Sequence, residues 1–374
     1  MIEELFGNIL NLQWQQVVMW AIGGLLIWLA IKKQMEPSLL LPMGFGAILV
    51  NLPMSGAVTQ IVDGVTEFGP IDVLFDAGIS NELFPLLLFV GIGAMIDFTP
   101  LLSNPKMMIF GAAAQFGIFF TLCVAVLLGF DVKDAASIGI IGAADGPTAI
   151  VVANMFQSNY LGAIVVVAYS YMALVPIVQP FVIKRITTQH ERKIRMSYAA
   201  RPVSKMTKIL FPVIITVIAG LVAPRSVSLI GFLMFGNLIR ECGVLDGLSE
   251  TAQKDLANLI TLFLGLTVST KMQAASFLTP QTLLILLLGL VAFTFDTVGG
   301  VLVAKVYNIF AKEKINPMIG AAGISAFPMS ARVINKMGLE EDNQNFLLMH
   351  AVGINVSGQI ASVIAGGMIM TLFA

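Results

Sequence analysis

Long apolar runs separated by short charged stretches dominate the chain. Five runs contain no Asp, Glu, Lys or Arg, and each is at least as long as the roughly 20 residues that a helix needs to cross a bilayer. These runs are residues 5–31, 107–130, 146–183, 272–295 and 343–374. The pattern predicts a polytopic membrane protein built of helices.

About twelve apolar segments can be distinguished, and several are short. They lie near residues 15–31, 39–52, 83–97, 106–130, 135–156, 160–183, 209–223, 227–240, 255–270, 280–305, 315–338 and 345–373. We expect an all-α fold in which about ten of these segments span the membrane and two are broken or re-entrant.

The distribution of charge predicts the orientation. Residues 184–208 contain eight Lys and Arg and one acid, Glu191. Basic loops stay on the cytoplasmic side, so this stretch is predicted to be a cytoplasmic linker in the inner (cytoplasmic) membrane of the cell. Lys32 and Lys33 place the end of the first helix inside as well, whereas the loop 52–82 holds five acids and no base, which favours the outer face.

This orientation requires a break in segment 135–156. If every segment crossed, the helix that ends at Ile183 would finish outside, beside the most basic loop. The centre of the segment reads Gly142-Ala-Ala-Asp-Gly-Pro147, and its Gly and Pro residues interrupt helices. A similar break around Ala326-Phe-Pro328 in segment 315–338 keeps the preceding lysines inside. Either break can belong to a re-entrant hairpin or to a broken helix that crosses.

Short similar blocks recur in the same order on both sides of the linker. They are Leu41-Pro-Met-Gly-Phe-Gly46 and Gly231-Phe-Leu-Met-Phe-Gly236, Phe89-Val-Gly-Ile-Gly93 and Phe263-Leu-Gly-Leu-Thr267, and Ile141-Gly-Ala-Ala144 and Ile319-Gly-Ala-Ala322. Because the first half starts outside and the second inside, we expect two repeats of inverted topology, residues 1–183 and 209–374, as in many secondary transporters.

Composition excludes several classes of function. Only 11% of the residues are charged and the net charge is -1, so neither a soluble domain nor a nucleic-acid-binding surface is expected. Two Cys and two His are too few for a disulfide framework or a zinc centre. The chain contains no Walker-type loop, zinc-protease motif or nucleophile elbow.

Asp145 and Arg332 are the two charged residues within apolar segments that we expect to have a function. A charge at bilayer depth costs at least a few kcal/mol. Asp145 lies at the first break, where a carboxylate and free carbonyls can hold a cation; alternatively it only caps the broken helix. Arg332, after the second break, can bind a carboxylate or extend to the cytoplasmic surface.

Neutral oxygen ligands are available in the second half. Asn316, Ser325 and Asn355 lie near the second break, although such residues more often form interhelical hydrogen bonds. Asp296 is expected to be structural, as are Asp97 and Lys271 at the ends of short segments.

Four sequence blocks closely resemble the β subunit of the sodium-pumping biotin-dependent decarboxylases, which act on oxaloacetate, methylmalonyl-CoA or glutaconyl-CoA. The blocks run from Gly142 to Ala149, from Val167 to Pro176, from Asn316 through Ser325 to Arg332, and from His350 to Asn355. They follow the family's order, and the resemblance extends over nearly the whole chain.

The resemblance implies an enzyme that decarboxylates carboxybiotin, consumes a proton and exports sodium, its only metal. By position, the residues associated with sodium are Asp145, Asn316, Ser325 and Asn355, and those associated with carboxybiotin and the proton are Tyr171 and Arg332. Gly320 would let the backbone approach this region, and Gly142 and Gly146 would do so at the first break.

The resemblance also implies partners. These are a carboxyltransferase subunit, a biotin carrier protein that supplies the biotin, and a small single-span membrane subunit; a homo-oligomer is expected, with a trimer favoured. Oxaloacetate-specific members are often longer in the N-terminal half, so the length of this chain favours an acyl-CoA substrate.

Two other readings remain. The residues by themselves fit a secondary transporter that exchanges sodium or protons for an organic anion equally well, and only the family blocks separate the two. A purely structural membrane anchor would not need Asp145 and Arg332.

Overall fold

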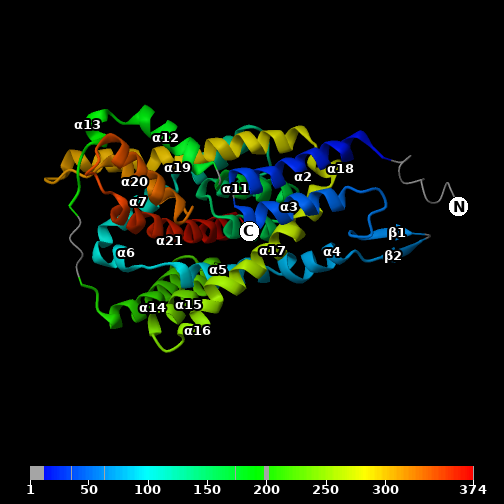
Figure 1. Cartoon of the computed structure of the whole chain (residues 1–374), viewed down its shortest axis with the longest axis horizontal. Helices are drawn as coiled ribbons and strands as arrows, with labels where there is room; N and C mark the ends of the chain where they lie inside the picture. The colour runs from blue at the N-terminus through cyan, green and yellow to red at the C-terminus, as the bar shows by residue number, and fades with distance from the viewer. Residues whose placement is uncertain (1–11, 35, 63, 173, 198–201, 374) are drawn as a thin grey trace.

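The computed structural model describes residues 12–34, 36–62, 64–172, 174–197 and 202–373. Helices dominate the fold (Figure 1). The first half contains α2 (Trp14–Lys33), α3 (Pro37–Val50), α4 (Pro70–Phe75), the π-helix η1 (Asp76–Ser80), α5 (Leu83–Met95), α6 (Thr99–Ser103), η2 (Pro105–Met107), α7 (Met108–Ala113), α8 (Phe116–Leu127), α9 (Val132–Gly139), η3 (Ile140–Ala143), α10 (Gly146–Met155), α11 (Leu161–Met172) and α12 (Val175–Ile186).

The linker carries the short helix α13 (Gln189–Arg192). The second half contains α14 (Lys205–Val222), η4 (Pro224–Ser226), α15 (Val227–Cys242), α16 (Asp246–Thr251), the π-helix η5 (Ala252–Leu256), α17 (Ala257–Val268), η6 (Ser269–Met272), α18 (Ala274–Phe277), α19 (Pro280–Phe310), η7 (Pro317–Gly323), α20 (Met329–Glu341) and α21 (Leu348–Phe373).

Five helices of the described chain are long and apolar enough to cross a membrane, and up to seven spans result if each bent helix pair counts as one. The molecule is therefore a multi-pass helical membrane protein, and the expected number of about ten spans stays a prediction. Only 22% of the apolar window of α2 and 11% of that of α14 are buried, against 67% for α21. Helix α21 thus lies in the protein core, and α2 and α14 lie at its periphery.

Two segments differ from the expected elements. The apolar segment 160–183 is bent by 71° between α11 and α12, because Pro176 in the first turn of α12 lacks the N–H that would continue α11.

The loop 52–82 contains a small antiparallel hairpin of β1 (Gln60–Val62) and β2 (Val65–Glu67), in which Ile61 pairs with Thr66. The all-α expectation did not include it.

Both expected helix breaks are present. In the first, α9 continues into η3, which ends at Ala143; Ala144, with a φ of +52°, then turns the chain, and Asp145 is extended before α10 begins. In the second, η7 ends at Gly323 and the chain reaches α20 only after Pro328. Proline and glycine explain both interruptions, as the sequence indicated.

The basic linker and the acidic loop lie at opposite ends of the molecule. Figure 1 shows α13 at one end of the long axis and the β1–β2 hairpin at the other. This arrangement agrees with the prediction that the two loops face opposite sides of a membrane.

Glycines let the two halves pack closely in a reciprocal way. An added Cβ at Gly93 of α5 would lie 1.8 Å from the carbonyl oxygen of Leu233 in α15, and one at Gly236 would lie 2.1 Å from that of Val90. Similarly, α3 and α17 meet at Gly265, where a Cβ would be 2.9 Å from the Leu39 carbonyl oxygen. Thus, counting only helices of at least ten residues, the second helix of each half packs on the third helix of the other.

Candidate functional site

The two breaks contact each other directly. The backbone N–H of Ser325, just after η7, donates to the carbonyl oxygen of Ala143 at the end of η3, with an N···O distance of 2.8 Å. Residues almost 200 positions apart in the chain therefore meet where both helices are interrupted. Broken helices that cross in this way bring backbone polar groups and helix ends to one point inside the membrane.

Asp145 is buried at this crossing, with 4% of its surface exposed. Its Oδ2 accepts hydrogen bonds from the hydroxyl groups of Thr148, at 2.8 Å, and Ser362, at 3.0 Å. Its Oδ1 accepts the backbone N–H of Thr148 at 3.3 Å, so the carboxylate also caps α10. The capping interpretation and the ion-site interpretation are therefore compatible, because a hydroxyl that donates to the carboxylate can turn its oxygen towards a cation instead.

Helix α21 holds the second break in place. The Asn355 amide donates to the carbonyl oxygen of Ile324 at 2.6 Å, and the Gln359 amide donates to that of Ser325. The Ser325 hydroxyl donates to the Gly358 carbonyl oxygen at 3.2 Å. Asn355 Oδ1 is buried and has no hydrogen-bond partner among the described residues, so it is an oxygen that a cation can use.

Three polar residues of this site were not predicted from the sequence. Gln359 and Ser362 follow Asn355 at the i+4 and i+7 positions of α21, so all three project from one helix face. Thr148 lies three residues after Asp145, the spacing at which an N-cap partner is expected. Helical spacing of polar residues in an otherwise apolar run was the signal that could have identified them.

Asn316 lies in a different environment. It is the first residue before η7, and its side chain bonds to the linker instead of Asp145: the amide donates to the carbonyl oxygens of Arg192 and Ile194. Its Oδ1 accepts the N–H of Met318 and so caps η7. The structure brings Asp145, Ser325 and Asn355 to one crossing and places Asn316 at the far end of η7.

The two residues associated with carboxybiotin lie on other helices. The Tyr171 hydroxyl, at the end of α11, donates to the carbonyl oxygen of Leu286 in α19. Arg332 is exposed on the first turn of α20, directly after the second break. Neither shares a hydrogen bond with Asp145 in the described part of the chain.

The three glycines allow close contacts at the breaks. A Cβ at Gly146 would lie 2.1 Å from the ring of Tyr169, and one at Gly320 would lie 2.1 Å from the carbonyl oxygen of Gly300 in α19. A Cβ at Gly142 would lie 2.6 Å from Asp296 Oδ2. Side chains at these positions would push the broken segments away from their neighbours.

Two polar cavities flank the crossing at opposite ends of the molecule. One, of about 630 Å³, lies beside the linker and is lined by Lys106, Arg195 and Lys314 among others. The other, of about 810 Å³, lies beside the acidic loop, where Asp72 and Asp76 line it. Helix α10 begins at the Asp145 site and reaches the second cavity with its last turn.

Asp296 is fully buried in α19, and its Oδ1 accepts the N–H of Ile118 in the first turn of α8 at 3.2 Å. The expected structural role thus takes the form of a cap from another helix. We expect Asp296→Leu to lower the free energy of unfolding by about 0.5–1.5 kcal/mol, since the Ile118 N–H loses one of its two acceptors and keeps only the Gln115 carbonyl oxygen, whereas Asp296→Asn keeps an oxygen there. Thermal unfolding would measure the difference.

Thr297→Val is the matched control for this prediction, because among the described residues the Thr297 hydroxyl bonds within its own helix, to the Phe293 carbonyl oxygen. A Leu variant as stable as the unmodified protein would show that Asp296 does not support α8.

These features define a class: a helical membrane protein in which two interrupted helices cross around a buried carboxylate, an arrangement that ion-coupled transport proteins use. The sequence model of the Na+-transporting oxaloacetate decarboxylase beta subunit matches residues 15–373. The chain therefore belongs to this family of sodium-transporting decarboxylase subunits, as the sequence blocks predicted.

Relatives within the family act on different acids. The glutaconyl-CoA decarboxylase subunit beta of Acidaminococcus fermentans is 48% identical, covering 96% of this chain and 93% of the relative. The methylmalonyl-CoA decarboxylase subunit beta of Propionigenium modestum is 47% identical, with 96% and 94% covered. The oxaloacetate decarboxylase beta chain of Klebsiella pneumoniae is 46% identical, with 95% and 94% covered.

Proposed function

We propose that this subunit decarboxylates carboxybiotin, consumes a proton and couples the reaction to sodium export from the cytoplasm. The observation that carries the proposal is the buried carboxylate of Asp145 at the crossing of two helix breaks. In a protein of this family, such a site is suited to a cation that must leave water inside the membrane.

The proposed sodium site combines one charge with neutral oxygens. Asp145 supplies the charge, and the hydroxyls of Thr148 and Ser362 already lie at its Oδ2. Ser325 and Asn355 add oxygens from the second break, and the family resemblance also assigns Asn316 to sodium. Oxygen ligands of this kind suit hard cations such as sodium.

Sodium export requires access to the site from each side in turn. The reciprocal packing of α3 on α17 and α5 on α15 supports two inverted repeats, and in such folds one bundle moves against the other around a fixed site. The cavity beside the linker would face the cytoplasm and that beside the acidic loop the outside. The decarboxylation must favour one of these states, since a ligand shifts an equilibrium only through differential affinity.

In the chemical step, the bond between the carboxyl carbon and the biotin nitrogen breaks, CO2 leaves, and biotin takes up one proton. Loss of CO2 is easier when the carboxylate leaves water and a proton is delivered. Arg332, exposed after the second break, would bind the carboxylate through its planar guanidinium. Tyr171 would belong to the proton path.

The proposal includes the partners of the family. A carboxyltransferase subunit would move the substrate's carboxyl group to biotin on a carrier protein. A small single-span subunit would complete the complex, and the chain would form a homo-oligomer, with a trimer favoured. The alignment with the Klebsiella relative extends over 409 positions and that with the Acidaminococcus relative over 359. Since this chain has 374 residues, the longer alignment contains insertions in the oxaloacetate enzyme, which supports an acyl-CoA substrate.

Purification of the chain with its native partners tests the proposal. We expect a biotinylated protein to co-purify and carboxybiotin to decay faster with sodium chloride than with choline chloride at equal ionic strength. In proteoliposomes, sodium uptake should require the carboxylated carrier and stop when avidin blocks the biotin.

The competing function is exchange of sodium or protons for an organic anion, with Arg332 binding the anion. Absence of a biotinylated partner, together with sodium uptake driven by an organic anion gradient, would support that function and contradict ours.

A further inference from the structure

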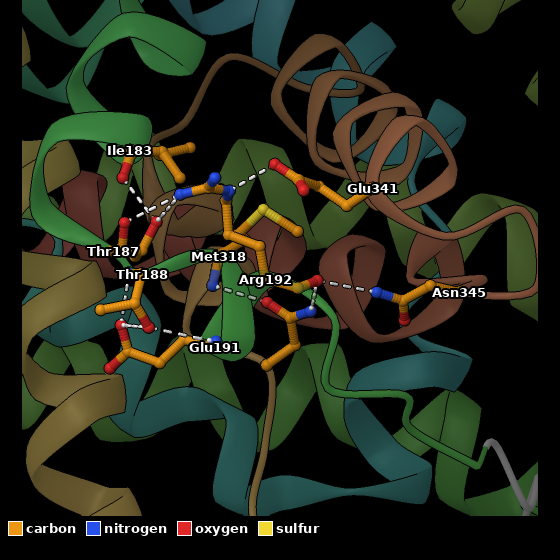
Figure 2. A network of polar contacts seen from close by, with 9 residues as sticks. Ile183, Thr187, Thr188, Glu191, Arg192, Met318, Glu341 and Asn345 are labelled. Carbon is orange, nitrogen blue, oxygen red and sulfur yellow. Dashed lines mark hydrogen bonds and ion pairs between the residues drawn. The ribbon is translucent and has the colours of Figure 1, made fainter.

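The linker segment 187–197, here called the clasp, is bound to four parts of the second half. It contacts α19, the start of η7, the end of α20 and the loop before α21. Figure 2 shows Arg192 between Glu341 of α20 and Asn345 of the loop before α21. The sequence indicated only a basic cytoplasmic loop. The hydrogen bonds make it a folded element that joins segments far apart in the chain.

Arg192 is the centre of the clasp. Its Nε lies 2.5 Å from Glu341 Oε1 at the end of α20, and each side chain of this pair is only 13% exposed. Its Nη1 donates to the carbonyl oxygen of Thr187 at 2.8 Å. A partly buried ion pair with such additional hydrogen bonds contributes more to stability than an exposed surface pair.

The backbone of the clasp is bound by two asparagine side chains. Asn316 Nδ2 donates to the carbonyl oxygens of Arg192, at 2.8 Å, and Ile194, at 3.0 Å. Asn345 Nδ2 donates to the same Arg192 oxygen at 2.9 Å. Asn316 is fully buried, and with its Oδ1 on the N–H of Met318 both ends of its amide are engaged.

Ion pairs at the edge of the clasp add to this binding. Glu191 Oε1 lies 3.2 Å from Lys305 Nζ, and Arg195 Nε lies 2.6 Å from Asp342 Oδ2. The hydrogen bond from Arg195 lowers the pKa of Asp342 below its usual value. A lowered carboxyl pKa keeps this contact charged at neutral pH and weakens it only as the pH falls through that value.

We propose that Asn316 is a positioning residue, which ties the clasp to the second helix break and so sets where Ser325 lies at the Asp145 site. The inference rests on the proposed function for the identity of the ion. It gives Asn316 a role that differs from a direct sodium ligand.

The path from Asn316 to the site is short and buried. The seven residues of η7, all buried, follow Asn316 directly, and Ser325 comes two residues after η7 ends. The N–H of Ser325 donates to Ala143, in the same segment as Asp145. Gln179 of α12 also binds the Ala321 carbonyl oxygen within η7 at 2.8 Å. A shift at Asn316 would therefore be transmitted to the crossing, because a packed interior deforms little.

Asn316→Asp separates the two roles. The variant keeps an oxygen to cap η7 but loses the donors to Arg192 and Ile194, and its charge repels those carbonyl oxygens. A direct sodium ligand would bind at least as well after this change, because carboxylates are preferred ligands of hard cations. A positioning residue would instead release the clasp.

The experiment uses the whole complex in detergent and measures two quantities for each variant. The first is the rate of trypsin cleavage after Arg192 and Lys193, followed by mass spectrometry. The second is the sodium concentration for half-maximal decarboxylation, compared with the maximal rate. We expect Asn316→Asp to be cleaved about 3–10-fold faster, because a segment that has lost hydrogen bonds opens more often and is then accessible to the protease.

Sodium should counteract this release. Suppose that sodium binds only to molecules in which the clasp is closed. A variant with a smaller closed fraction then needs a proportionally higher sodium concentration for half-maximal decarboxylation, while its maximal rate recovers at saturating sodium. By reciprocity, sodium chloride should slow cleavage of the variant relative to choline chloride.

Asn345→Ala is the matched variant, since Asn345 binds the same Arg192 oxygen but is assigned to no ion site. It should raise cleavage and the half-maximal sodium concentration in the same direction. Asn355→Ala, at the crossing, should change sodium dependence with no effect on cleavage measured in choline chloride, without sodium. The inference is overturned if Asn316→Asp leaves cleavage unchanged. Faster cleavage without any sodium effect in the unmodified protein would instead contradict the proposed function.

Discussion

Asp145→Asn is expected to abolish sodium-stimulated decarboxylation, with a fall in rate of at least about 100-fold, or about 2.7 kcal/mol. The Asn side chain has the same size and can still accept a hydrogen bond from Thr148, but it lacks the charge that compensates a cation away from water. The measurement is the decarboxylation rate of the purified complex against sodium concentration, with sodium uptake into proteoliposomes alongside it.

Asp134→Asn is the control for this change. Asp134 is also a nearly buried acid before the first break, and its Oδ1 accepts the Ser158 hydroxyl at 2.6 Å, but it lies on α9 away from the crossing. Its sodium dependence should remain normal. Sodium-dependent activity that survives in Asp145→Asn would remove Asp145 from the ion site.

Gly358→Ala is expected to destabilise the protein at the second helix break. An added Cβ would lie 2.1 Å from the carbonyl oxygen of Gly323, so α21 must move away from the second break. Such overpacking costs about 1–3 kcal/mol, which corresponds to a fall in melting temperature of several degrees. The Ser325 hydroxyl would lose its acceptor at Gly358, so activity should fall as well.

Gly24→Ala is the control, because an added Cβ there meets no atom within 4 Å. Alanine has the higher helix propensity, so this variant should be as stable as the unmodified protein or slightly more stable. A Gly358→Ala protein with normal melting temperature and activity would show that α21 can move away from the break without consequence.

One carboxylate can serve both the fold and the proposed sodium site. Asp145 caps α10 by accepting the N–H of Thr148 at its Oδ1, and its Oδ2 accepts the hydroxyls of Thr148 and Ser362. Because hydroxyl groups both donate and accept, the same side chains can support the helix cap and supply oxygens to the proposed cation site.

The local pattern of the sequence was sufficient for the membrane location and for both breaks. Apolar runs longer than a bilayer core identify spans because lipid cannot satisfy exposed polar groups. Gly146-Pro147 and Pro328 interrupt helices through the geometry of their own backbone. The bend at Pro176 has the same cause, although we expected a continuous helix there.

Only the tertiary structure decided which polar groups meet. Ser362 reaches Asp145 across 217 positions of sequence, and Asn316 reaches the Arg192 carbonyl across 124. Residue types showed that Asp145 and Asn316 were both suitable ligands, but they lie in different environments. The sequence by itself determined that the chain is a membrane protein with two interrupted helices, since those properties depend on residues that are close together in the sequence. The composition of the site depends on how distant helices pack, which no local pattern specifies.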